Sequence, residues 1–119
     1  MITADLIGAN KPELAVYRAL TKLGEVFSFQ KPLMGGRNVR GGAIADFLLP
    51  EYSLIISVIG WYWHGSLETK ARDRMQHIAL ASYGYRVIYI DEADANENAE
   101  HFVKEAIRGI DHSRYAQIL

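Results

Sequence analysis

The segment Leu54-Ile55-Ile56-Ser57-Val58-Ile59 decides the fold of this 119-residue chain. Ser57 is the one residue in it that interrupts an aliphatic run. A short and almost continuous apolar run is typical of a strand that is buried on both faces at the centre of a sheet. The sequence on either side must therefore supply neighbouring strands and covering helices.

Segments on both sides of this run predict three more strands and three helices. The strands are expected at 26–30, at 43–48 before Pro50, and at 85–90. The helices are expected from Asn10-Lys11-Pro12 to Gly24, over 67–82 before Gly84, and around the apolar stripe of Ala99, Phe102, Val103, Ala106 and Ile110. This order predicts an α/β fold in which three strands form a meander and the second helix makes a crossover.

The second helix has a less regular pattern than the other two. One of its faces is predicted to be apolar and carries Ala71, Met75, Ile78, Ala79 and Ser82. The other face carries Lys70, Asp73, Arg74 and His77. We therefore expect the Met75 and Ile78 side to be the apolar one.

The composition fits one domain spanning residues 1–119. Half of the residues are hydrophobic and 23% are charged, which is enough to bury a single core. The absence of cysteine excludes disulfide scaffolds, zinc knuckles and thiolate catalysis. No apolar run approaches the ~20 residues that span a bilayer, and residues 1–5 lack a signal-peptide pattern. We therefore expect a soluble cytoplasmic protein without a membrane partner.

Charge is nearly balanced in total but unevenly distributed. Thirteen Lys and Arg residues against fourteen Asp and Glu give a net charge of −1, which excludes a globally basic nucleic-acid binder but not a locally basic groove. Residues 18–40 hold five bases and one acid, whereas residues 91–105 hold six acids and one base. These segments fit either a basic groove with an acidic far side, or ordinary solvated loops and a solvated helix face.

Asp46 is the first candidate functional residue. It shares a predicted strand face with Ile44 and Leu48, and an unpaired buried carboxylate is costly. Either backbone amides or Arg37 and Arg40 satisfy it, or it projects from the sheet as a ligand for a hard cation such as Mg²⁺.

Three further residues could carry chemistry. Glu13 lies on the apolar stripe of the first helix, where it is either a partner of the helix dipole or an acid that reaches a site beside the core. His64 follows the central strand and is placed to act as a general base. Asp73 comes nine residues later, and an exposed pair with His77 explains it equally well. Periodicity alone does not bring these residues together.

With Asp46 on the second strand, the order of elements resembles the PD-(D/E)xK nuclease superfamily. This resemblance implies a restriction-endonuclease-like αβββαβ core, a mixed four-stranded sheet flanked by helices, here with an added C-terminal helix. In that superfamily an acid and, two residues later, a lysine usually stand on the third strand. Ser57 and Ile59 occupy those positions in this chain.

One branch of the superfamily is more similar. The very-short-patch-repair endonucleases and the phage-type and homing nucleases with an EDxHD signature carry a stretch that resembles Gly60-Trp61-Tyr62-Trp63-His64. The remaining acids of that signature match Glu13, Asp46 and Asp73. The likeness covers about residues 10–110, although the zinc-binding cysteines of the repair enzymes are missing.

The resemblance implies a metal-dependent endodeoxyribonuclease that hydrolyses DNA phosphodiester bonds with Mg²⁺ or Mn²⁺. It implies that Asp46 binds the metal with the help of a backbone carbonyl near Val58. Glu13 is then expected to hold metal-bound water. His64 is expected to take a proton from the attacking water, and Asp73 to orient His64.

The DNA partner is expected to contact basic side chains and one aromatic residue, namely Lys31, Arg37, Arg40, Lys70, Arg72, Arg74 and Trp61. Specificity is expected to come from a homodimer, a separate specificity protein, another domain or the structure of the DNA, because no recognition-helix pattern is present. Two alternatives stay open. Ser57 and Ile59 also fit a degenerate nuclease fold that binds nucleic acid or serves assembly, and the residues from Trp61 to His64 also fit a pocket wall.

Overall fold

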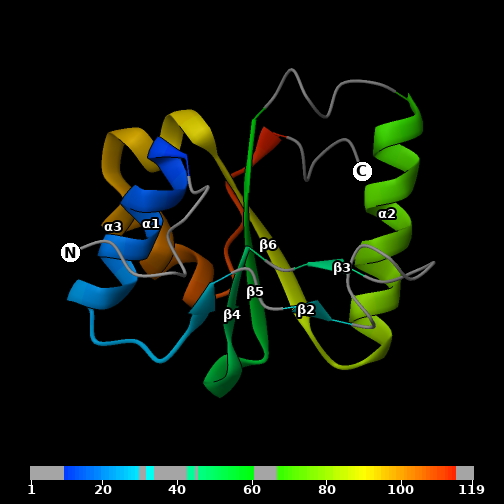
Figure 1. Ribbon diagram of the computed structural model, residues 1–119, viewed down its shortest axis with the longest axis horizontal. Helices are drawn as coiled ribbons and strands as arrows, with labels where there is room; N and C mark the ends of the chain where they lie inside the picture. The colour runs from blue at the N-terminus through cyan, green and yellow to red at the C-terminus, as the bar shows by residue number, and fades with distance from the viewer. Residues whose placement is uncertain (1–9, 30–31, 34–42, 45, 61–66, 115–119) are drawn as a thin grey trace.

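The structure, a computed structural model, is built on a four-stranded sheet (Figure 1). It describes residues 10–29, 32–33, 43–44, 46–60 and 67–114, and of 32–33, 43–44, 67–70 and 73 only the backbone. The strand order is β1-β4-β5-β6, with β1 at Ser28–Phe29, β4 at Phe47–Leu49, β5 at Leu54–Ile59 and β6 at Arg86–Asp91. β5 pairs antiparallel with β4 and parallel with β6, so the sheet is mixed.

Helices cover both faces of this sheet. α1 (Lys11–Lys22) and α3 (Glu92–Ile107) pack together on one face, and α2 (Leu67–Ser82) lies on the other (Figure 1). α2 connects β5 to its parallel neighbour β6, which is the crossover that the sequence predicts. The expected α/β class, a mixed four-stranded sheet flanked by helices, is therefore confirmed.

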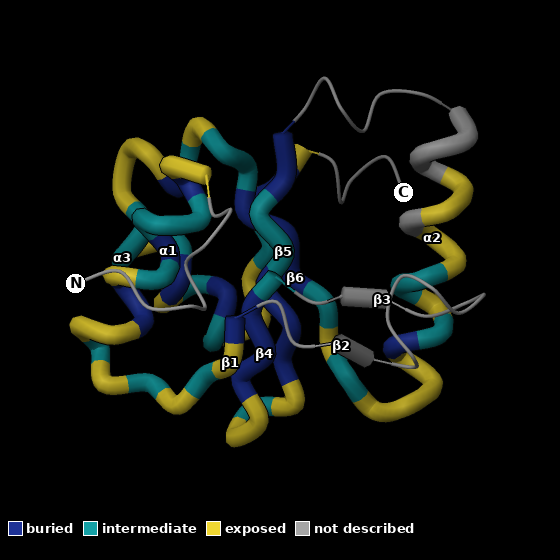
Figure 2. Tube along the Cα trace, viewed as in Figure 1, coloured by how far each residue is buried: buried dark blue, intermediate teal, exposed yellow. Residues whose placement is uncertain are grey.

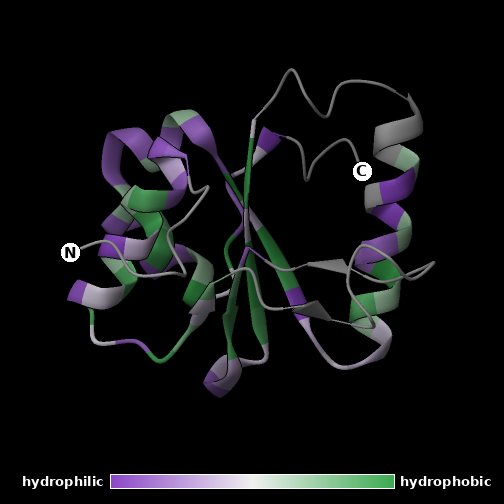
Figure 3. Ribbon diagram, in the orientation of Figure 1, coloured by the Kyte–Doolittle hydropathy of each residue, from purple (hydrophilic) through white to green (hydrophobic). Residues whose placement is uncertain are grey.

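β5 is buried from both sides, as its apolar run predicts (Figure 2). Leu54 and Ile56 point into the larger core, which they share with Leu20 of α1 and Val103 of α3. Ile55 points to the opposite face and belongs to a smaller cluster with Leu48 and Leu80. Figure 3 shows the apolar strands between helices that carry both hydrophobic and hydrophilic residues.

Each of α1, α2 and α3 is followed by a glycine in the left-handed backbone region. Gly24, Gly84 and Gly109 have φ values of 73°, 90° and 86°. After α1, the Glu25 N–H donates to the Leu20 carbonyl and the Gly24 N–H donates to the Thr21 carbonyl, which is a Schellman motif. The same pair of bonds follows α2 and α3. Gly24 and Gly84 therefore end the helices where the sequence predicts.

The strands on the β4 side are shorter than predicted. The expected strand at 43–48 is divided between β3 (Ala43–Ile44) and β4, which belong to different sheets. β3 pairs antiparallel with β2 (Pro32–Leu33) to form a separate two-stranded sheet. A short 3₁₀ turn, η3 (Pro50–Tyr52), ends β4 at the expected proline.

The prediction for the faces of α2 is wrong. Met75 and Ile78 are 72% and 60% exposed, whereas Leu80 is 6% exposed and packs on the sheet. His77, predicted to lie on the polar side, is half-buried with its ring centroid 6.2 Å from that of Tyr89. Helical periodicity alone does not show which face meets the sheet, and Leu80 sets the buried face through its contact with Leu48 and Ile55.

α3 consists of two helical pieces joined at Asn98, whose φ and ψ are −159° and 76°. The Asn98 side chain accepts a hydrogen bond from the His101 N–H at 3.2 Å and so caps the second piece. This second piece carries the predicted stripe, in which Val103 and Ala106 are buried.

Candidate functional site

Asp46 immediately precedes β4 and lies beside Ser57 and Val58 of β5. Its Oδ2 accepts a hydrogen bond from the Val58 N–H at 2.7 Å and one from the Ser57 hydroxyl at 3.2 Å. The residue is half-buried. A backbone amide is thus a partner of Asp46, as in one of the two structural interpretations of the sequence. The other interpretation was pairing with Arg37 and Arg40.

The main chain of Val58 lies at the same edge of β5 as the Asp46 carboxylate. In an extended strand the N–H and C=O of one residue point to the same side. The Val58 carbonyl is therefore directed toward the β4 side of β5. The registered pairs of β4 and β5 stop at Phe47 and Ile56, so β4 does not extend to Val58. This end of β5 consequently combines a carboxylate with a main-chain carbonyl.

Glu13 lies in the first turn of α1 and forms a capping box with Asn10. The Glu13 N–H donates to the Asn10 side chain at 2.9 Å, and the Asn10 N–H donates to Glu13 Oε1 at 3.1 Å. Glu13 is half-buried. In Figure 1, α1 begins at the end of the sheet where β5 ends. Glu13 therefore has a structural role at the helix start, and its role toward a metal stays a prediction.

The other predicted site residues are described to different extents. Arg72 and Arg74 are exposed on α2, where they are available to a phosphate backbone. Asp73 precedes His77 by one helical turn on α2. Five of the predicted residues lie outside the described part of the chain, namely Lys31, Arg37, Arg40, Trp61 and His64. For Lys70 and Asp73 the described part is the backbone.

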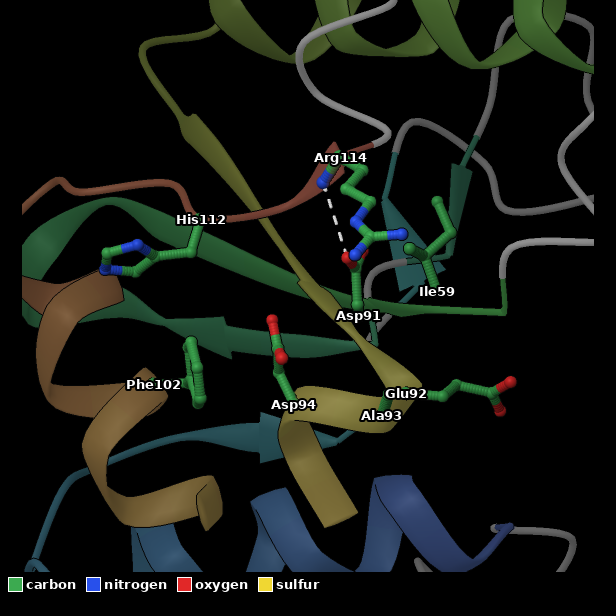
Figure 4. A pocket seen from close by; sticks show the side chains of 8 residues that line it. All are labelled: Ile59, Asp91, Glu92, Ala93, Asp94, Phe102, His112 and Arg114. Atoms are coloured by element: carbon green, nitrogen blue, oxygen red, sulfur yellow. Dashed lines mark hydrogen bonds between the residues drawn. The ribbon is translucent and has the colours of Figure 1, made fainter. Parts of the chain in front are cut away.

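A cavity of about 600 Å³ opens at the C-terminal ends of β5 and β6 (Figure 4). It is lined by Ile59, Asp91, Glu92, Ala93, Asp94, Phe102, His112 and Arg114. Burial is the main cause that raises the pKa of Asp94 above 3.8, and the nearby charges of Asp91 and Glu97 act in the same direction. The acidic lining makes this cavity unsuited to a polyanion without a bound cation.

The segment after α3 runs back along the outer edge of β6. Asp111 accepts a hydrogen bond from the Tyr89 N–H at 3.1 Å and one from the Ser113 N–H at 2.8 Å. The Ser113 hydroxyl donates to Asp91 at 2.6 Å. Burial raises the pKa of Asp111 although both of its amide hydrogen bonds favour the ionised form. These bonds cover an edge strand that would otherwise be free to pair with another chain.

A second polar group joins α3 to the segment that follows it. The potential ligand atoms of His101, Glu105 and His112 all lie within 4.8 Å of one another. His112 Nε2 is 3.1 Å from Glu105 Oε1, and this hydrogen bond is the main cause that holds the pKa of Glu105 below 4.5. The i, i+4 spacing of His101 and Glu105 is visible in the sequence. His112 joins them because the chain reverses after Gly109, so sequence reasoning missed the group.

The sheet order and the parallel crossover through α2 define an α/β domain with a mixed four-stranded sheet and helices on both faces. Among solved structures, the catalytic domain of the homing endonuclease I-Bth0305I is similar to this chain, with a TM-score of 0.62 and 26% sequence identity. The match covers 84% of this chain and 92% of that one. No protein-family model and no curated protein matches the sequence. In the part of the chain that the structure describes, no helix has the length and apolar character needed to cross a bilayer.

Proposed function

We propose that this protein is a divalent-metal-dependent endonuclease that hydrolyses phosphodiester bonds in DNA. The observation that carries this proposal is the likeness, over 84% of the chain, to the catalytic domain of a homing endonuclease. Because a fold by itself does not define an activity, the proposal also needs a site. Asp46 supplies one, since the resemblance to EDxHD nucleases matches it to their strand acid.

The residues around Asp46 fit a hard divalent cation. Mg²⁺ is bound by carboxylate oxygens, carbonyl oxygens and water. Asp46 provides a carboxylate whose orientation is fixed by the Val58 N–H, and the Val58 carbonyl is directed to the same edge of β5. When bound there, a divalent cation polarises the scissile phosphate and stabilises charge on the leaving oxygen.

The proton transfers are assigned to the remaining residues of the EDxHD resemblance. His64 lies four residues beyond Gly60, the residue that follows β5, and would take the proton of the attacking water. Asp73 of α2 would orient the imidazole of His64. Glu13 would hold metal-bound water with the carboxylate that also closes the capping box.

The DNA backbone would lie against the basic residues that the resemblance and the charge pattern suggest. Arg72 and Arg74 are exposed on α2, and Lys31, Arg37, Arg40 and Lys70 complete the proposed set, with Trp61 beside the bases. Contacts of this kind position a duplex without reading its sequence. Site selection would then come from a second copy of the chain, a separate specificity protein, another domain or the structure of the DNA.

One observation favours a second candidate function, which is binding of DNA without cleavage. Ser57 occupies the position where related nucleases carry an acid, and its hydroxyl donates to Asp46. A single carboxylate binds a divalent cation more weakly than two do. A chain that lost cleavage in this way would still bind nucleic acid through its basic residues.

A plasmid assay distinguishes the two functions. The wild-type protein is incubated with supercoiled plasmid and Mg²⁺, Mn²⁺ or EDTA, next to His64→Ala and the control Glu51→Ala. Glu51 is exposed in η3, at the opposite end of β4 from Asp46. Nicking that needs the metal, disappears in His64→Ala and persists in Glu51→Ala supports the endonuclease.

Binding is measured in parallel at increasing salt concentration. Salt-sensitive binding without nicking supports the second function, because phosphate contacts release counterions. The absence of both binding and nicking contradicts both functions.

A further inference from the structure

We propose that His101, Glu105 and His112 form a transition-metal site that fastens the C-terminal segment to α3. This site uses none of the residues assigned to DNA cleavage. The three potential ligand atoms lie within 4.8 Å of one another, and they come from two segments that the reversal after Gly109 brings together.

The distances fit a tetrahedral ion after a small movement of one side chain. Bonds of about 2.0–2.1 Å in a tetrahedral zinc site place neighbouring ligand atoms about 3.4 Å apart. His112 Nε2 and Glu105 Oε1 are already 3.1 Å apart. His101 is exposed, so its ring can rotate toward them without disturbing the core.

The chemistry of the ligands favours zinc and its neighbours over magnesium. Two imidazoles and one carboxylate form a set that binds Zn²⁺ in proteins and leaves one position for water. Imidazole also suits Cu²⁺ and Ni²⁺, whereas Mg²⁺ and Ca²⁺ prefer oxygen ligands. The ion in this site would therefore differ from the one proposed at Asp46.

The surroundings of the three residues support the same assignment. Glu105 Oε2 accepts a hydrogen bond from the Arg108 guanidinium at 3.1 Å, which orients the carboxylate and leaves Oε1 toward His112. His112 also lines the cavity that contains the Asp94 carboxylate. The Phe102 ring packs edge-on against both imidazoles, with centroids 5.1 Å from His101 and 5.5 Å from His112.

A metal here would stabilise the covered edge of the sheet. His112 lies between Asp111 and Ser113, whose hydrogen bonds hold the segment on β6. The unfolded chain does not bring the three ligands together, so binding favours the folded state. At a hundredfold excess of Zn²⁺ over its Kd, the melting temperature is expected to rise on the order of 10 °C.

The test uses Zn²⁺ and Co²⁺ as probes in the presence of saturating Mg²⁺. Calorimetry gives the affinity and stoichiometry for Zn²⁺, the visible absorption of Co²⁺ reports a tetrahedral site, and thermal unfolding reports stabilisation. The main variant is His101→Ala, which removes one ligand and leaves the hydrogen bond between His112 and Glu105. His112→Ala is a second variant, and His77→Ala is the matched control on α2.

We expect one Zn²⁺ per chain, bound at least about tenfold more weakly by both variants of the group and equally well by His77→Ala. Binding should be unchanged in Asp46→Asn, so failure of the nuclease proposal leaves this result intact. The proposal is overturned if the wild type binds no Zn²⁺, or if His101→Ala and His112→Ala bind it as the wild type does. In that case His101, Glu105 and His112 form only a cluster of hydrogen bonds and ion pairs that does not bind a metal.

Discussion

The Val58 N–H donates a 2.7 Å hydrogen bond to Oδ2 of Asp46 where β4 stops and β5 continues. The carboxylate takes the place that a backbone carbonyl would have if β4 were longer. A hydrogen bond to a charged group contributes about 1.5–3 kcal/mol, so Asp46 stabilises the sheet besides its proposed role toward a metal. Variants at this site must therefore separate stability from cleavage.

Ser57→Ala removes the hydroxyl that donates to Asp46 and keeps the Val58 bond. We expect the free energy of unfolding to fall by about 1 kcal/mol. Cleavage of plasmid DNA should stay within about threefold of the wild type, since less than 1 kcal/mol of barrier is involved. Urea denaturation and nicking rates measure the two effects. A hundredfold loss of cleavage in a stable Ser57→Ala protein would show that the hydroxyl takes part in the chemistry.

Glu13→Gln separates helix capping from the proposed binding of metal-bound water. Glutamine still accepts from the Asn10 N–H, so stability should change by less than about 0.5 kcal/mol. Cleavage should fall about tenfold or more, because the negative charge is lost. The matched control is Asn10→Ala, which should lower stability by about 1 kcal/mol and leave the cleavage rate of the folded protein unchanged. Equal cleavage by Glu13→Gln and the wild type would leave Glu13 with the capping role alone.

The corrected orientation of α2 predicts opposite sensitivities for two apolar residues. Met75→Lys should change the free energy of unfolding by less than about 0.5 kcal/mol, because Met75 is 72% exposed. Leu80→Ala should lower it by about 2–4 kcal/mol, because Leu80 packs with Leu48 and Ile55. Chemical denaturation of both variants measures this. A larger loss in Met75→Lys than in Leu80→Ala is incompatible with the observed packing.

Sequence patterns predicted the elements whose burial or termination is determined by residues that lie close together in the chain. The uninterrupted run of β5 needs apolar neighbours on both faces, and Gly24 and Gly84 end helices because they adopt positive φ at low cost. These features depend on local chemistry. The class of fold could therefore be predicted before the structure.

The parts that were missed depend on contacts between distant segments. The buried face of α2 follows from the contact of Leu80 with Leu48 and Ile55, which helical periodicity does not contain. The group of His101, Glu105 and His112 exists because the chain folds back after α3. The pairing of Glu13 with Asn10 is the exception, because this capping box is local and its spacing of three residues stands in the sequence.

The raised pKa of Asp111 makes a prediction about pH. The largest cause of the raised pKa is burial of the Asp111 carboxyl group. The folded protein therefore binds the proton of this group more tightly than the unfolded chain, in which the pKa of the group is near 3.8. The carboxyl therefore lowers stability as pH rises from 3.8 through the raised pKa, and this penalty is absent at lower pH. The free energy of unfolding of Asp111→Asn, minus that of the wild type, should increase as the pH rises from 3.8 through the raised pKa of Asp111. Urea denaturation across this range measures the difference, and a flat or falling difference contradicts the raised pKa.

The most direct test of the proposed metal role is the nicking rate of Asp46→Asn in Mg²⁺. The asparagine carbonyl can still accept from the Val58 N–H, so the free energy of unfolding should stay within about 1 kcal/mol of the wild type, whereas Asp46→Ala loses this partner. We expect folded Asp46→Asn to nick supercoiled plasmid about a hundredfold more slowly than the wild type, or not at all. Nicking by Asp46→Asn at the wild-type rate would contradict the assignment of Asp46 as the metal-binding acid.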